Sequence, residues 1–177
     1  GAAGGDSDQT EFEITLTDSL DDMLDSKCIF IASPTLNHYD YIMKILPEFN
    51  GYIFCEKPPC SSLAQTQSLS LLDLKDKERI YFNFNYRFSE LAKLCKEALK
   101  NNTYGKLISL EFYSSHGLAF KSNYQNNWRN TSNGMLENIV GNVGIHYIDL
   151  INHLLKDAEV SSIQSLKVSK KSRFSDS

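Results

Sequence analysis

The stretch CIFIASPTLNHYDYIMKILPEFNGYIFCEKPP, residues 28–59, decides the fold of this chain. It opens with an apolar run of strand length, residues 28–32. Pro34 ends that run, because proline fixes φ and cannot donate to a ladder. Apolar residues then recur at helical spacing until an Asn-Gly pair at 50–51, a typical helix stop. A second apolar run follows at residues 52–55. Strand, helix and strand at these lengths predict a βαβ unit, whose parallel strands are joined by a right-handed crossover.

Polar and charged residues follow both predicted strands. The segment from Ser33 to His38 comes after the first strand, and Glu56 and Lys57 come after the second. In open parallel sheets, ligands bind beyond the carboxyl ends of the strands, which lie at one edge. The sequence therefore predicts a ligand site where these two segments meet.

The composition is that of an ordinary globular protein. Hydrophobic residues make up 41% and charged residues 23%, and 18 basic against 22 acidic side chains give a net charge of −4. This balance argues against a general nucleic-acid binder, and no apolar run approaches the length of a membrane span. We therefore expect neither nucleic acid nor membrane among the partners.

The cysteines argue for a reducing compartment. They stand at positions 28, 55, 60 and 95 with no C-x-x-C pair, and no histidine falls near them at zinc-site spacing. Cys28 and Cys55 lie in predicted buried strands, where cysteine behaves as a small apolar residue. We expect reduced thiols, a cytoplasmic protein and no metal site.

Periodicity predicts further elements along the chain: a helix capped by Ser61 or Ser62 and reaching about Leu74, a strand over 79–85, a helix over 91–99, a strand over 107–113, a helix over 141–155 and a strand over 160–169. The strand at 107–113 alternates polar and apolar residues, which indicates one exposed face and an antiparallel sheet. A boundary near Gly105 therefore divides this α/β chain. Residues 1–104 belong to a parallel-sheet domain, and residues 105–177 begin an α+β domain with an open, mainly antiparallel sheet.

The predicted helix over 141–155 carries one narrow polar stripe, formed by Asn142, His146, Asp149 and His153. At about 100° per residue these positions fall within roughly 60° of one another, and most of the remaining surface is apolar. Such a helix is largely buried, so the stripe lines a cavity or is satisfied by neighbours. The alternative is a solvated face with an Asp149–His153 pair. We favour the cavity, with His153 in a structural role.

Three ordered motifs carry a resemblance to a known family: Ala32-Ser33-Pro34-Thr35 with His38, then Glu56-Lys57-Pro58, then Asn142-x-Gly144-x-His146-x-x-Asp149. Together they resemble the glucose–fructose oxidoreductase / inositol dehydrogenase (Gfo/Idh/MocA) family. Its members are NAD(P)-dependent dehydrogenases, mostly of sugars, cyclitols and sugar nucleotides. The resemblance covers most of residues 14 to 169. It implies a Rossmann-like dinucleotide-binding domain within residues 1–104 and the start of a substrate-binding and oligomerisation domain in residues 105–177.

The resemblance also implies roles for single residues. The catalytic set is Lys57, His146 and Asn142, and the set near NAD or NADP is Ser33, Pro34, Thr35, Asn37, His38, Glu56, Lys57 and Arg87. The lysine of the family's tripeptide contacts both substrate and nicotinamide, and a cis bond between Lys57 and Pro58 fits the family. Asn142 stands where the family most often has Asp.

These residue types suit the oxidation of a secondary alcohol. Taking a hydride from the alcohol carbon requires removal of the hydroxyl proton. A lysine can accept that proton if burial and a cationic nicotinamide ring lower its pKa from about 10.4. A histidine one hydrogen bond away can relay the proton or orient the hydroxyl.

The expected function is hydride transfer between nicotinamide and a sugar, cyclitol or sugar-nucleotide alcohol by a homo-oligomer that assembles through the second-domain sheet. One alternative is a non-catalytic ligand-binding or regulatory relative, and another is an assembly module. The chain shows no strand–G-x-G-x-x-G–helix signature, so we interpret it as incomplete at both ends. We expect this chain alone to be inactive and to bind NAD(H) weakly, because the pyrophosphate normally sits on that glycine turn.

Overall fold

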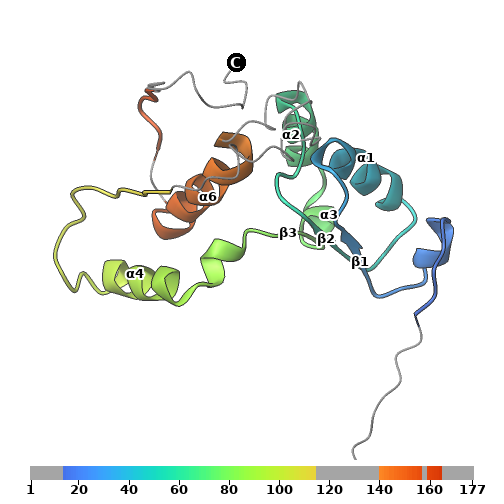
Figure 1. Cartoon of the computed structure of the whole chain (residues 1–177), viewed down its shortest axis with the longest axis horizontal. Coiled ribbons are helices and arrows are strands. Elements are labelled where there is room, and N and C mark those ends of the chain that lie inside the picture. The colour runs from blue at the N-terminus through green and yellow to red at the C-terminus, as the bar shows by residue number, and fades with distance from the viewer. Residues whose placement is uncertain (1–13, 115–139, 157–158, 165–177) are drawn as a thin grey trace, which may run out of the picture.

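A three-stranded parallel sheet, in the order β1-β2-β3, lies at the centre of the first half of the structure (Figure 1). The strands are β1 (Cys28–Ile31), β2 (Tyr52–Cys55) and β3 (Ile80–Phe82). The computed structural model describes residues 14–114, 140–156 and 159–164. Cys28 pairs with Tyr52 and Ile53 with Ile80, both in parallel register. The fold class expected for this part, an α/β parallel sheet, is confirmed.

Helix α1 (Thr35–Ile45) makes the crossover from β1 to β2, so the predicted βαβ unit is confirmed. The helix ends before the Asn-Gly pair at 50–51, because Pro47 has no N–H with which to continue the helical hydrogen bonds. The chain enters β2 at Gly51, where a side chain has no room. A Cβ there would lie 2.4 Å from the carbonyl oxygen of Lys27.

The hydrophobic core lies on the face of the sheet that α1 covers. Its buried side chains are Ile29, Ile31, Ile42, Ile45, Leu46, Phe49, Ile53 and Cys55. Leu69 of α2 (Leu63–Ser70) packs against this cluster from the side. Each large apolar side chain buried in this way contributes roughly 1.5–3 kcal/mol. The core therefore fixes the strands whose carboxyl ends carry the polar segments.

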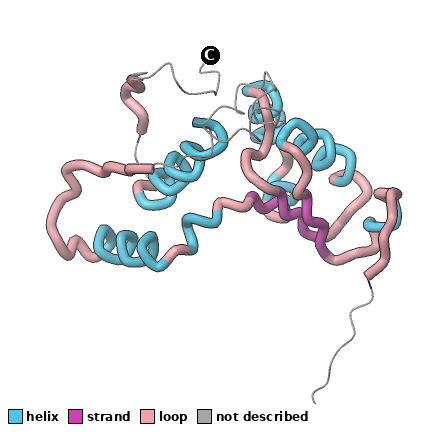
Figure 2. The backbone as a smooth tube through the Cα atoms, viewed as in Figure 1, coloured by secondary structure: helices cyan, strands magenta, loops and turns pink. Residues whose placement is uncertain are grey.

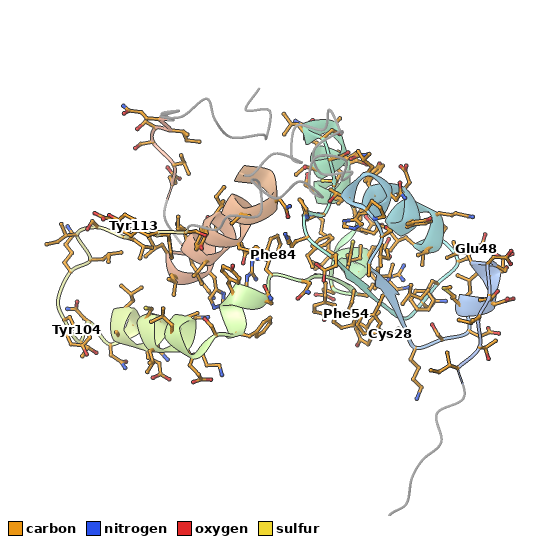
Figure 3. The ribbon with its side chains drawn as sticks, viewed as in Figure 1. Cys28, Glu48, Phe54, Phe84, Tyr104 and Tyr113 are labelled. Atoms are coloured by element: carbon orange, nitrogen blue, oxygen red, sulfur yellow. The ribbon has the colours of Figure 1, made fainter. Side chains whose placement is uncertain are left out.

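The other face of the sheet carries a row of stacked aromatic rings. The Phe54 ring lies 5.1 Å from the Phe30 ring and 5.1 Å from the Tyr81 ring, centroid to centroid. Phe30 is 75% exposed, and Phe54 lies on the side of the sheet away from α1 (Figure 3). The strands therefore alternate buried and exposed residues, although their apolar runs predicted buried strands.

In the second half, β3 leads through the short turn η2 (Asn85–Phe88) into α4 (Glu90–Lys100), which packs beside α6 (Ile145–Leu154; Figures 1 and 2). Both helices were predicted and are confirmed. The first turn of the predicted 141–155 helix is a separate π-helical element, η5 (Val140–Gly144). None of the helices in the described ranges is long and apolar enough to cross a bilayer.

Two predicted boundaries shift in the helical regions. The helix expected up to about Leu74 splits into α2 and α3 (Leu74–Lys77), with the break at Asp73. Ser62 caps α2 as expected, because its hydroxyl accepts a hydrogen bond from the Gln65 N–H. The strand expected over 79–85 shortens to β3. Asn85, the last residue of the expected strand, begins η2. A 3-10 turn, η1 (Asp21–Met23), precedes β1.

The antiparallel sheet expected for residues 105–177 is not formed within the described residues. Residues 107–113 form no strand there, and neither do residues 159–164. The remainder of the second predicted strand, 165–169, lies outside the described residues. A strand needs a partner to bury its apolar face and to satisfy its backbone groups, so alternation alone does not produce a sheet.

Ile53 of the central strand tests the position of the core. Its side chain is 0% exposed, whereas Ile108 is 97% exposed and provides a control with the same substitution. We expect Ile53→Ala to lower the free energy of unfolding by about 2–5 kcal/mol, because the deletion leaves a cavity. Ile108→Ala should change it by less than about 0.5 kcal/mol. Urea unfolding followed by circular dichroism measures both, and equal effects would contradict the assigned core.

Candidate functional site

The side chain of Lys57 joins the end of the parallel sheet to the helical half of the structure. Its ammonium donates one hydrogen bond to the backbone oxygen of Asn142 at 2.6 Å and another to its Oδ1 at 2.8 Å. Lys57 follows β2, and Asn142 lies in η5, immediately before α6. Two of the residues expected in the catalytic set therefore meet, although 85 positions separate them in the sequence.

His146 lies one helical turn after Asn142, in the first turn of α6, and its side chain is buried. Burial lowers the pKa of its imidazole from the ordinary 6.5, and the nearby Lys57 charge lowers it further. The carboxylates of Asp149 and Glu56 act in the opposite direction, as smaller contributions. The imidazole is therefore neutral near pH 7 and able to accept a proton or a hydrogen bond.

One nitrogen of that imidazole has no hydrogen-bond partner among the described residues. It is Nδ1 of His146, a buried atom. A buried polar atom without a partner costs free energy, so such atoms normally receive one from protein, water or ligand. Nδ1 of His146 therefore remains able to form a hydrogen bond that the described protein atoms do not supply.

Aromatic rings enclose His146. The Tyr86 ring stacks on the imidazole with centroids 4.4 Å apart and planes 15° apart, and the Phe84 ring meets it edge-on at 6.4 Å. Phe84 lies between the end of the sheet and α6 (Figure 3). Sequence reasoning missed both rings. The aromatic-rich run around Arg87 was the available signal, but Phe84 was placed in the strand expected over 79–85 and Tyr86 after it, so neither ring was connected with α6.

Arg87 pairs with the carboxylate of Asp149, one turn further along α6. Its Nε donates to Oδ2 at 2.6 Å and its second terminal nitrogen donates to Oδ1, which makes a bidentate pair. The hydrogen bond to Asp149 raises the pKa of the guanidinium. The sequence placed Arg87 near the cofactor, and the structure places it in this ion pair with a largely buried partner.

His38 ties together the two polar segments at the sheet edge. Its ring nitrogens lie 2.8 Å from the carbonyl oxygen of Pro58 and 2.8 Å from that of Ser33, and the side chain is 1% exposed. Both nitrogens thus face the backbone of the protein. His38 therefore positions the two segments expected to line the cofactor, including the cis bond between Lys57 and Pro58.

Glu56 is also held by the sheet. Its backbone N–H donates to the Ile31 carbonyl at 2.8 Å, and its carboxylate accepts from the amide of Asn83 at 2.7 Å. The remaining expected cofactor residues lie after β1: Thr35 is buried, Ser33 is half-buried, and Pro34 and Asn37 are exposed. They share the carboxyl edge with Glu56, because β1 and β2 are parallel neighbours.

His153 lies apart from these groups, near the other end of α6. Its Nε2 is 3.1 Å from the Lys96 ammonium, which donates the hydrogen bond. All four cysteines are free thiols. Within the described ranges, no group of three or more His, Cys, Asp or Glu side chains could hold a metal ion.

Comparison with known proteins gives a match to one family and similarity to several dehydrogenases. Residues 5–84 match the oxidoreductase family with an NAD-binding Rossmann fold, GFO_IDH_MocA. Glucose-6-phosphate 3-dehydrogenase of Bacillus subtilis is 25% identical over 141 residues, which cover 78% of this chain and 40% of that protein. The chain thus spans less than half the length of this relative.

Two solved structures share the fold. Myo-inositol 2-dehydrogenase from Lactobacillus plantarum superposes with a TM-score of 0.64 at 21% identity, over 78% of this chain and 41% of that one. An inositol dehydrogenase homolog from Azotobacter vinelandii, complexed with NADH and myo-inositol, gives a TM-score of 0.62 at 20% identity, over 74% and 33%. At these identities the similarity establishes the fold.

The bridging role of His38 can be measured by its contribution to stability. We expect His38→Phe to lower the free energy of unfolding by about 1–3 kcal/mol, because the carbonyl that accepts the ring N–H loses its donor while ring volume is kept. Tyr39→Phe is the control in the same helix, since it loses a single hydroxyl contact with Ser68 at 2.8 Å. Its cost should stay below about 1 kcal/mol. Equal costs in chemical denaturation would show that His38 does not bridge the segments.

Proposed function

We propose that the chain belongs to the Gfo/Idh/MocA family of oxidoreductases with an NAD-binding Rossmann fold, which residues 5–84 match, and that the complete protein is an NAD(P)-dependent dehydrogenase. Its reaction would transfer a hydride between nicotinamide and a secondary alcohol of a sugar, cyclitol or sugar nucleotide. The observation that supports this most is the meeting of Lys57 with the η5–α6 segment that carries His146. A lysine that can act as a base in its amine form, beside a neutral imidazole at a sheet edge, suits proton removal from a hydroxyl group.

The proposed roles of Lys57 and His146 follow from the surroundings of each side chain. Lys57 takes the hydroxyl proton as the free amine, the form that a cationic nicotinamide ring beside it would favour, and its position is fixed by Asn142. His146 is neutral and has an unpartnered nitrogen, so it accepts a hydrogen bond from the substrate and orients the hydroxyl. Asn142 orients Lys57 through an uncharged amide, at the position where the family most often has a carboxylate.

The carboxyl edge fits the nicotinamide end of the cofactor. When bound, NAD or NADP supplies the ring that accepts or donates the hydride. Ser33, Pro34, Thr35, Asn37 and Glu56 would line it, on backbone segments that His38 holds together. Arg87 supports this site through Asp149.

We further propose that residues 105–177 begin a substrate-binding domain and that the complete protein is a homo-oligomer through its sheet. The free thiols support a cytoplasmic location, since disulfides are rare there. A non-catalytic ligand-binding relative is the second candidate. The feature that favours it is Asn142, whose amide cannot act as a base. Nicotinamide reduction with a panel of polyols separates the two functions.

Substitution of Lys57 tests the proposed reaction in the complete protein. Lys57→Met should lower turnover by about 100-fold or more, because the proton acceptor is removed, while cofactor affinity stays within a few-fold. Lys93→Met is the control, since Lys93 is exposed and pairs only with its helix neighbour Glu90 in the described contacts. Steady-state kinetics and cofactor titration measure both quantities. Unchanged turnover in Lys57→Met would contradict the assignment.

A further inference from the structure

The turn η2 contacts α6 through two adjacent side chains. Tyr86 stacks on His146, and Arg87 pairs with Asp149, which lies three residues further along the same helix. We propose that Tyr86 and Arg87 are positioning residues that together fix the plane of the His146 imidazole in the site it shares with Lys57. We call these two residues the η2 clamp. Its consequence for catalysis rests on the proposed dehydrogenase function, whereas its effect on the imidazole does not.

The stack takes the place of the contact that usually orients a functional histidine. Such a histidine normally donates one ring N–H to a carboxylate or carbonyl, which sets both its tautomer and its plane. Nδ1 of His146 has no such partner among the described residues. Instead, the face of Tyr86 and the edge of Phe84 bound the imidazole on two sides. The Tyr86 ring lies nearly parallel to the imidazole and the Phe84 ring nearly perpendicular to it. Together the two rings restrict the imidazole to one plane.

The exposure of Tyr86 argues against a role as an ordinary core residue. Tyr86 is 36% exposed, whereas His146 beneath it is 9% exposed. A side chain that keeps this much contact with water gains less from burial than the core aromatics do. Its ring also meets Tyr147 at 5.6 Å, so it spans two successive residues of α6. Tyr86 therefore acts as a cover over the imidazole.

The Arg87–Asp149 ion pair fixes the position of the Tyr86 ring over the imidazole. Positions three apart on a helix share a face, so Asp149 stands beside His146 on the side that η2 approaches. A bidentate guanidinium–carboxylate pair fixes direction as well as distance. The Arg87 guanidinium also lies over the Phe84 ring, with its Cζ 5.6 Å from the centroid. The Arg87 side chain thus holds both Asp149 of α6 and the Phe84 ring against η2.

The charged groups near His146 determine how its pKa changes when the η2 clamp is removed. They are Lys57, which opposes protonation, and Asp149 and Glu56, which favour it. Arg87 neutralises Asp149, so its removal leaves a carboxylate beside the imidazole and raises the pKa of His146. Removal of the Tyr86 ring admits water and also raises that pKa, towards the ordinary value of 6.5.

The experiment is an NMR titration of the His146 Cε1–H resonance in the 177-residue chain, assigned by its disappearance in His146→Gln. In the unsubstituted chain, the resonance should lie upfield, because the Tyr86 ring current shields it, and should titrate below 6.5. Tyr86→Leu should move it downfield and raise its titration midpoint, whereas Tyr86→Phe should keep both. Arg87→Met should raise the midpoint, and Arg87→Lys should restore it only in part, because lysine cannot form the bidentate pair.

His153 provides the internal control, because it lies beyond the Tyr86 stack and should be unchanged in the Tyr86 variants. A Tyr86→Leu chain whose His146 resonance and midpoint are unchanged would overturn the clamp. So would a Tyr86→Phe chain that behaves like Tyr86→Leu, since the phenyl ring keeps the stack.

The complete protein provides the second readout. Tyr86→Leu should lower kcat about tenfold, leave the KM for the cofactor within twofold and move the acidic limb of the pH profile upward. A complete protein without dehydrogenase activity whose His146 still responds as described would support the clamp and contradict the proposed function. An active enzyme whose Tyr86→Leu variant shows neither the kinetic nor the NMR change would contradict the clamp alone.

Discussion

The hydrogen bonds from the Lys57 ammonium to Asn142 are the contact on which the site depends. They connect a loop that follows the central strand to the turn that begins α6, and no local sequence feature brings those two segments together. The same contact sets the environment of His146, since the Lys57 charge helps to keep that imidazole neutral. A cation and a neutral base thus share one site because two elements that lie far apart in the sequence meet there.

The polar residues of the site are held mainly by backbone and by one another. His38 binds the carbonyls of both strand-end segments, and Glu56 is held to the neighbouring strand through its own N–H. On the helical side, the Arg87–Asp149 pair and the Tyr86 ring hold His146. Side chains held by several protein contacts in this way have the support that preorganised sites require.

The sequence predicted what is local and left open what depends on long-range packing. Apolar periodicity and Gly51 were sufficient for the βαβ unit, because those signals lie within a few residues of the structure they specify. The meeting of Lys57 with Asn142 came from the resemblance of their motifs, since no periodicity links segments 85 positions apart.

The expectations that changed involve tertiary contacts. Residues 107–113 alternate as a strand does, but alternation predicts a face and supplies no partner. Phe84 was placed in the strand expected over 79–85 and Tyr86 after it, and only the packing of η2 on α6 shows that the two rings flank His146. Arg87 was placed near a cofactor, and its buried carboxylate partner could not be identified without the position of α6.

A double-mutant cycle between Lys57 and Asn142 measures whether Lys57 and the η5–α6 segment share one site. The unfolding free energies of Lys57→Met, Asn142→Ala and the double variant isolate the energy of the pair. The structure predicts a coupling of about 1 kcal/mol or more, since a hydrogen bond from a charged donor to the Asn142 side chain is lost. A coupling of zero would show that the two segments do not meet and would contradict the account of the site.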